Sequence, residues 1–265
     1  MFDAILELIP AGRTEGWAVA ALCAAVIVIG IAKSGFGGGV GILAVPLMAA
    51  AIDPGAALGV MLPILIAADV VAVAQHHRHF SGFHLGWSLL GAAVGIAFGT
   101  VVLWLFQVSE SQARMLNLTV GGVCVGFVAV QVYRLLGGKV PKVPDNRRSA
   151  IGAGGLAGAV STLAHAAGPV MTIYLLEHRL AKQRLVSTLV LFFFVVNIAK
   201  LPTYLGQGII NTQTLQASAW LILLVPVGSL IGIWLHRMVA EKPFALIMYV
   251  GALAAGARMV WKGMA

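Results

Sequence analysis

Two glycine-rich breaks, each ended by a proline, interrupt an otherwise apolar chain, one in each half. The first is KSGFGGGVGILAVP, from Lys33 to Pro46, and the second is GGLAGAVSTLAHAAGP, from Gly154 to Pro169. At membrane depth, backbone leaves helical geometry only where protein or a water-filled cavity satisfies its polar groups. Matching interruptions in two halves of a chain are the sequence pattern that points to a transporter's binding site. The breaks therefore predict a membrane protein built of two related halves.

The composition agrees with a protein embedded in lipid. Of the 265 residues, 60% are hydrophobic and only 10% are charged, whereas about 25% are charged in soluble domains. Several apolar runs are long enough to cross the hydrocarbon core of a bilayer. The net charge of +8 arises from basic residues spread over short loops, which is the pattern that orients membrane proteins. We therefore expect the lipid bilayer as a partner, and no nucleic acid.

The predicted fold is an all-α polytopic membrane protein with two repeats. Residues 1–136 form the first repeat, with a broken helical hairpin at 17–52, and residues 150–265 form the second, with a hairpin at 150–176. Residues 137–149, rich in Pro, Gly and charge, are the expected cytoplasmic linker. Three spans follow each hairpin, at 56–74, 85–106 and 115–136 in the first repeat and at 185–204, 217–235 and 244–261 in the second.

Charge predicts how the repeats are oriented. Most basic residues fall on loops that alternation places on one side, and the positive-inside rule makes that side cytoplasmic. The first hairpin then enters and leaves by the outer face and the second by the cytoplasmic face. Because three spans follow each hairpin, the second repeat is inverted relative to the first. Inverted repeats with broken helices are a transporter architecture in which one half rocks against the other to give alternating access.

Each half also contains a tryptophan followed by a glycine pair at the same offsets. Trp87 precedes Gly95 and Gly99, and Trp220 precedes Gly228 and Gly232. Small residues four positions apart let two helices approach closely, within one chain or across a dimer face. The shared offsets support a duplication and leave open whether the protein forms a homodimer.

Three formal charges lie well inside the apolar runs: Lys33, Asp69 and Lys200. Ionisable residues at this depth are costly and usually face a cavity or a partner. Aligning the repeats sets Asp69 opposite Asn197, and we expect Asp69, Asn197 and Lys200 to carry coupling or to tune the charge. One carboxylate cannot neutralise two lysines, so the excess positive charge predicts an anionic ligand. The alternative is a buried Lys–Asp pair that only fixes the register of the helices.

The breaks supply the candidate substrate-binding residues. From the first break these are Lys33, Ser34, Gly37, Gly38 and Gly39, and from the second Ser161, Thr162 and His165. Backbone N–H groups of the glycines, before a short helix, can cradle an oxyanion, and the side chains of the second break can donate to the same ligand. The alternatives are hydroxyls bonded to the preceding helical turn and a satisfied core histidine.

A histidine-rich stretch invites a metal interpretation. His76, His77, His79 and His84 lie close together, but Arg78 lies among them and no cysteine or carboxylate accompanies them. We therefore expect a cytoplasmic loop, with no metal site and no cofactor. Enzyme signatures such as HExxH or paired intramembrane aspartates do not occur in the sequence, so an enzyme is not expected.

At the breaks and the glycine pairs, the chain resembles the sulfite exporter TauE/SafE family, the toluene-sulfonate uptake permease group (TSUP). The resemblance lies in GFGGGVGILAVPLM and GGLAGAVSTLAHAAGPV and covers nearly the whole chain. It implies a carrier of the bacterial inner membrane for small anions of the sulfite, sulfonate or thiosulfate class. We therefore expect a secondary transporter, an exporter coupled to the proton gradient. An anion channel built on the same repeats and a metal-ion transporter are the alternatives.

Overall fold

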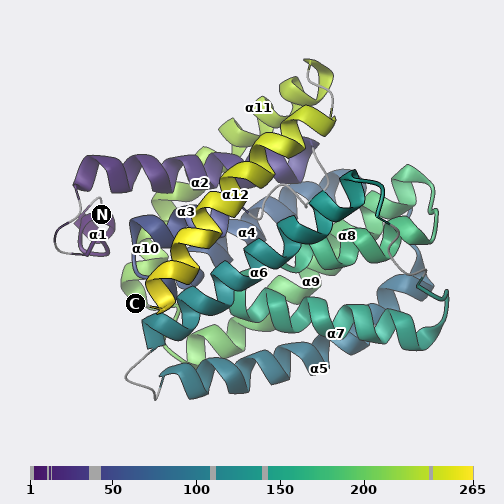
Figure 1. Ribbon diagram of the computed structural model, residues 1–265, viewed down its shortest axis with the longest axis horizontal. Helices are drawn as coiled ribbons and strands as arrows, with labels where there is room; N and C mark the ends of the chain where they lie inside the picture. The colour runs from purple at the N-terminus through teal and green to yellow at the C-terminus, as the bar shows by residue number, and fades with distance from the viewer. Residues whose placement is uncertain are drawn as a thin grey trace.

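The computed structural model describes residues 3–10, 12, 14–35, 43–107, 112–138, 143–238 and 241–264. Over these ranges the regular structure is helical throughout, which confirms the predicted all-α fold (Figure 1). The elements are α1 (Asp3–Leu6), α2 (Glu15–Gly35), α3 (Ala44–Ala51), α4 (Pro54–His76), α5 (Gly82–Gln107), α6 (Gln112–Leu135), α7 (Arg147–Ala164), α8 (Ala167–Glu177), α9 (Lys182–Gly206), α10 (Thr212–Leu221), the 3-10 turn η2 (Ile222–Leu224), α11 (Val225–Met238) and α12 (Glu241–Met264).

Six segments of the described chain are long and apolar enough to cross a membrane, which confirms a polytopic architecture. They are Glu15–Ser34, Pro54–His76, Gly82–Gln107, Ala113–Arg134, Lys182–Gly206 and Thr212–Leu235. The shortest has 20 residues, and at about 1.5 Å per residue it extends roughly 30 Å, the thickness of the hydrocarbon core. The first hairpin thus pairs α2, long enough to span alone, with α3 of 8 residues, and the second pairs α7 of 18 residues with α8 of 11.

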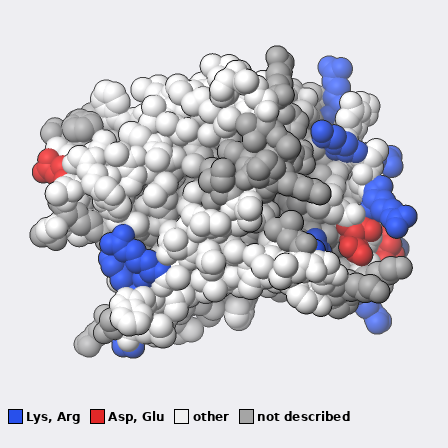
Figure 2. Space-filling model, turned by 45° about the horizontal axis from the view of Figure 1, so that its top comes forward, with Lys and Arg blue, Asp and Glu red and all other residues white. Residues whose placement is uncertain are grey.

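The outer surface is that of a lipid-embedded protein. On α5, Leu90, Val94 and Phe98 recur every four residues and are 58%, 68% and 61% exposed, whereas Gly91 and Gly95 of the same helix are buried. Large apolar side chains outside and small residues inside allow close helix packing within lipid. Figure 2 shows Lys and Arg side chains gathered mainly at one end of the molecule, with a largely uncharged surface along the middle of that face.

The glycine pairs lie at helix crossings that join the two halves. Helix α5 runs along α7 (Figure 1), and α11 runs along α2. A Cβ atom on Gly95 would lie 2.0 Å from the carbonyl oxygen of Gly155, and one on Gly228 would lie 2.5 Å from that of Ile27. Backbone therefore touches backbone at both crossings. The packing is also reciprocal. Helix α5 of the first half packs against α7 of the second hairpin, and α11 of the second half packs against α2 of the first hairpin.

Several helices begin before the positions expected from sequence. Helix α7 begins at Arg147, inside the expected linker, because the Asn146 side chain accepts from the Ser149 N–H and caps it. Helix α10 begins at Thr212, with a capping box that Asn211 and Thr214 form. The expected span 217–235 is interrupted by η2, which lies just before Pro226. Proline removes a backbone donor and clashes with the preceding turn, which favours such an interruption.

The second break is short. Helix α7 ends at Ala164, and His165 takes the left-handed conformation, with φ 49° and ψ 26°, before α8 starts at Ala167. In the first break, α2 ends at Gly35 and α3 starts at Ala44. The three glycines predicted to cradle an anion, Gly37, Gly38 and Gly39, lie outside the described residues.

Candidate functional site

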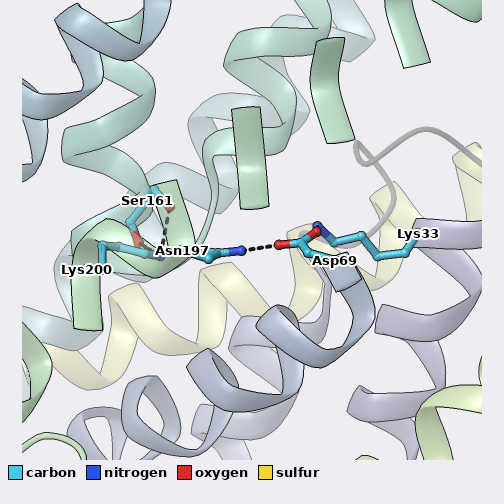
Figure 3. A network of polar contacts seen from close by, with 5 residues as sticks. All are labelled: Lys33, Asp69, Ser161, Asn197 and Lys200. Atoms are coloured by element: carbon cyan, nitrogen blue, oxygen red, sulfur yellow. Dashed lines mark hydrogen bonds and ion pairs between the residues drawn. The ribbon is translucent and has the colours of Figure 1, made fainter. Parts of the chain in front are cut away.

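Polar residues from four helices meet inside the helical body, where α4 packs against α9. Figure 3 shows Lys33 of α2 reaching Asp69 of α4, with Asn197 of α9 on the other side of the carboxylate. Next to them, Lys200 of α9 reaches Ser161 of α7. Both halves of the chain therefore contribute to one polar site, and both hairpins reach it.

The carboxylate of Asp69 is the centre of the first group of contacts. Lys33 Nζ donates to Asp69 Oδ1 in a short ion pair, and Asn197 Nδ2 donates to Oδ2 at 2.6 Å. The Asp69 side chain is fully buried, whereas the Lys33 side chain is 16% exposed. Lys33 Nζ also lies 4.9 Å from the centre of the Phe193 ring, within range of a cation–π contact. The buried negative charge is thus paired and hydrogen-bonded, as burial requires.

The buried amino group of Lys200 organises the second group of contacts. Its Nζ lies 2.9 Å from Ser161 Oγ, 3.2 Å from the Ser161 carbonyl oxygen and 3.0 Å from His165 Nδ1. Three acceptors match the three N–H donors of an ammonium group. His165 Nε2 lies 3.0 Å from the carbonyl oxygen of Leu58, which can only accept. The proton of His165 therefore sits on Nε2, and Nδ1 accepts from Lys200.

A partly open cavity adjoins both groups. The space that the centre of a water-sized molecule can occupy within it is about 50 Å³. Lys33, Ser161, His165 and Asn197 contribute its polar lining. The rest of the lining is apolar side chains and the start of α8, namely Ile29, Ala32, Met61, Leu65, Ala166, Ala167, Gly168, Pro169 and Phe193.

The start of α8 adds a backbone feature that was not predicted from the sequence. No side chain caps this helix at Ala166, and residues 166–169 line the cavity. The first N–H groups of a helix have no partner within the helix and carry the positive end of its dipole, so they favour anions. The sequence pattern that could have predicted this helix start is AHAAGP, in which small residues precede a proline in the first turn of a helix. The prediction placed a backbone cradle only in the first break.

Two predicted binding residues direct their hydroxyl groups elsewhere. Thr162 Oγ1 donates to the Gly158 carbonyl oxygen at 2.9 Å, and Ser34 Oγ lies 2.7 Å from the Gly30 carbonyl oxygen. Neither residue lines the cavity. The Thr162 hydroxyl makes the hydrogen bond to the preceding helical turn that was considered as its alternative from the sequence. Of the other predicted residues, Asp69 and Lys200 lie behind the cavity lining.

The chain is similar to one family of known proteins. It matches a family model described as Sulfite exporter TauE/SafE over residues 22–259. That range contains both breaks and every residue of the polar site. No curated protein and no solved structure matches the chain.

Proposed function

Because the chain belongs to the sulfite exporter TauE/SafE family, whose members are membrane transporters, we propose that it exports sulfite or a small organosulfonate. In this proposal it works in the bacterial inner membrane and is coupled to the proton gradient. One observation carries the assignment of the site: Lys33, Ser161, His165 and the uncapped start of α8 face a single cavity. Lys33, Ser161 and the start of α8 each favour or can donate to an oxyanion, whereas both ring nitrogens of His165 already have partners and only position its ring at the cavity.

The charge balance of the site also favours an anion. Two lysines, Lys33 and Lys200, stand against one carboxylate, Asp69, in a region walled by apolar side chains. With both lysines protonated, the site carries one excess positive charge. Electrostatic attraction is much stronger away from bulk water, so a monoanion that enters the cavity would restore neutrality. Lys33 is the cation that faces the cavity, and Lys200 acts from behind Ser161 and His165.

The mixed lining narrows the class of anion. Polar groups line part of the cavity, and Met61, Leu65 and Phe193 line another part. A sulfonate combines an oxyanion head with a carbon substituent, and sulfite is the head alone. The cavity therefore suits an anion whose charged oxygens meet Lys33 and the start of α8 while any organic group meets the apolar wall.

Asp69 gives a route to proton coupling. Both carboxylate oxygens of Asp69 have partners, and Lys33 is one of them. Because Lys33 also lines the cavity, the carboxylate and a bound anion would share it. A bound anion competes with Asp69 for Lys33, and in this proposal Asp69 is the group that carries the coupled proton. A proton is then expected to travel with the anion. Because the proton gradient across the bacterial inner membrane points inward, transport of this kind exports the anion only where the outward anion gradient exceeds the proton gradient.

Repeated geometry supports a duplication. Ser34 and Thr162 each bond the carbonyl oxygen of a glycine four residues earlier. Asp69 and Asn197 are 128 residues apart and bond each other, and the same shift relates Ser34 to Thr162. Together with the reciprocal crossings of α5 on α7 and α11 on α2, this supports two repeats that rock against each other. Inverted orientation of the second repeat remains part of the proposal.

Flux through the purified chain in proteoliposomes tests the proposal. Sulfite flux should saturate with concentration and should be accompanied by protons, measured with a pH dye inside the vesicles. Asp69→Asn should retain flux and lose proton movement, because the exchangeable carboxylate is gone. Glu15→Gln, at an exposed carboxylate of α2, is the control and should behave like the wild type. Flux that rises without saturation would instead support the channel, and no flux of sulfite or sulfonates would refute the substrate class.

A further inference from the structure

A second polar cluster lies at the other end of α8 from the cavity. His84 is in the first turn of α5, Asp145 directly precedes the residue that caps α7, and His178 directly follows α8. His84 Nε2 lies 3.9 Å from Asp145 Oδ1. One donor atom from each of the three residues lies within 4.8 Å of the other two. Imidazole nitrogen and carboxylate oxygen are ligands that zinc and similar divalent ions accept.

The orientation of His84 is set by a buried tyrosine. Tyr174 is 2% exposed, and its hydroxyl lies 3.0 Å from His84 Nδ1. This contact holds one ring nitrogen and leaves Nε2 directed toward Asp145. Metal-binding histidines usually have their second nitrogen held in this way, which fixes the orientation of the ring.

His178 carries a buried nitrogen with no partner. Its Nε2 is buried and makes no hydrogen bond within the described structure, a rare state for a buried polar atom. The ring lies against that of His84, with centroids 4.9 Å apart and an angle of 19° between the planes. One nitrogen of each ring belongs to the set of ligand atoms that lie within 4.8 Å of one another. A cation between them would give the nitrogen of His178 the partner it lacks.

We propose that His84, Asp145 and His178 bind one divalent cation of the zinc type. In a tetrahedral site with bonds of about 2.1 Å, ligand atoms lie about 3.4 Å apart. The present spacing, up to 4.8 Å, is wider, so binding would require the exposed Asp145 side chain and the His178 ring to move closer to His84. Water would complete the coordination. The exposed residues His76, His77 and His79 take no part, so this site shares only His84 with the histidine-rich stretch of the sequence.

The site would join the two halves of the chain. His84 begins a helix of the first half, and His178 ends the second hairpin, whose α8 reaches the cavity with its other end. A cation at the C-terminal end of α8 also suits the helix dipole. A bound ion would therefore hold α5 against α8 and slow any rocking of the halves. That consequence rests on the proposed transport function, whereas cation binding itself does not.

Isothermal titration of Zn²⁺ into the full-length, metal-stripped chain in detergent tests the site. The background is the triple variant His76→Asn, His77→Asn, His79→Asn, which removes competing surface histidines. We expect one Zn²⁺ per chain in this background. Asp145→Asn and His178→Asn should each weaken binding at least tenfold. Co²⁺ should give visible absorption bands in the background variant that these substitutions remove.

Two results would overturn a cation site at these three residues. One is zinc binding that disappears with the triple substitution, and the other is zinc binding that Asp145→Asn and His178→Asn leave unchanged. Asp145 is exposed and does not cap a helix, so its variant should fold, which thermal unfolding without metal verifies. Zinc binding of this kind in a chain that binds no sulfite would support the cation site alone, and sulfite binding in a chain that binds no zinc would leave only the transport proposal.

Discussion

At the scale of single residues, the polar site was partly predictable. Charges inside apolar runs need partners, so the sequence indicated that Lys33, Asp69, Asn197 and Lys200 belong together. It left open which lysine pairs with the carboxylate. The structure pairs Lys33 with Asp69 and sets Lys200 against Ser161. The choice depends on how the helices cross, which residue type and spacing do not encode.

The neighbouring hydroxyls of Ser161 and Thr162 should differ in function. Ser161 lines the cavity and accepts from Lys200, whereas the Thr162 hydroxyl bonds the Gly158 carbonyl. Ser161→Ala should weaken sulfite binding several-fold, in line with about 1 kcal/mol for a lost hydrogen bond. Thr162→Val should leave affinity unchanged. Calorimetry on both variants measures this, and an equal loss in the two would show that Thr162 also faces the ligand.

At the scale of helices, the sequence indicated close contacts but not their partners. The glycine pairs marked faces where backbones could touch, and the structure sets α5 on α7 and α11 on α2. A small-residue pattern identifies a contact face of a helix, while the partner follows from the arrangement of the whole bundle. The uncapped start of α8 was missed for a related reason, because its importance comes from the cavity it faces.

The contact between α5 and α7 predicts contrasting effects of two glycine substitutions on one helix. Gly95→Ala would bring a Cβ within 2.0 Å of a backbone oxygen, whereas nothing lies within 4 Å of a Cβ on Gly86. Overpacking of this kind costs about 1–3 kcal/mol, and a tolerated Gly→Ala change in a helix gains about 0.5–1 kcal/mol. Thermal unfolding in detergent should show a lower Tm for Gly95→Ala only. Equal Tm values would argue against tight packing at this crossing.

At the scale of the whole molecule, the two halves contribute unlike sides to one cavity. In the described chain the first half supplies Lys33 and the second supplies Ser161, His165 and the start of α8. Matching breaks indicated two halves of a membrane transporter, and the family match agrees that the chain is a membrane transporter. The inverted orientation of the second repeat stays a prediction, since it depends on which side of the membrane each loop occupies.

The central claim is that the halves meet around an anion held by Lys33. Calorimetric titration of sulfite into purified Lys33→Gln tests it most directly, with Lys182→Gln, at an exposed lysine of α9, as the matched control. A charge-assisted hydrogen bond is worth about 1.5–3 kcal/mol, so Lys33→Gln should raise Kd about ten- to hundredfold, while Lys182→Gln leaves it unchanged. Wild-type affinity in a folded Lys33→Gln protein, verified by thermal unfolding, would contradict the account.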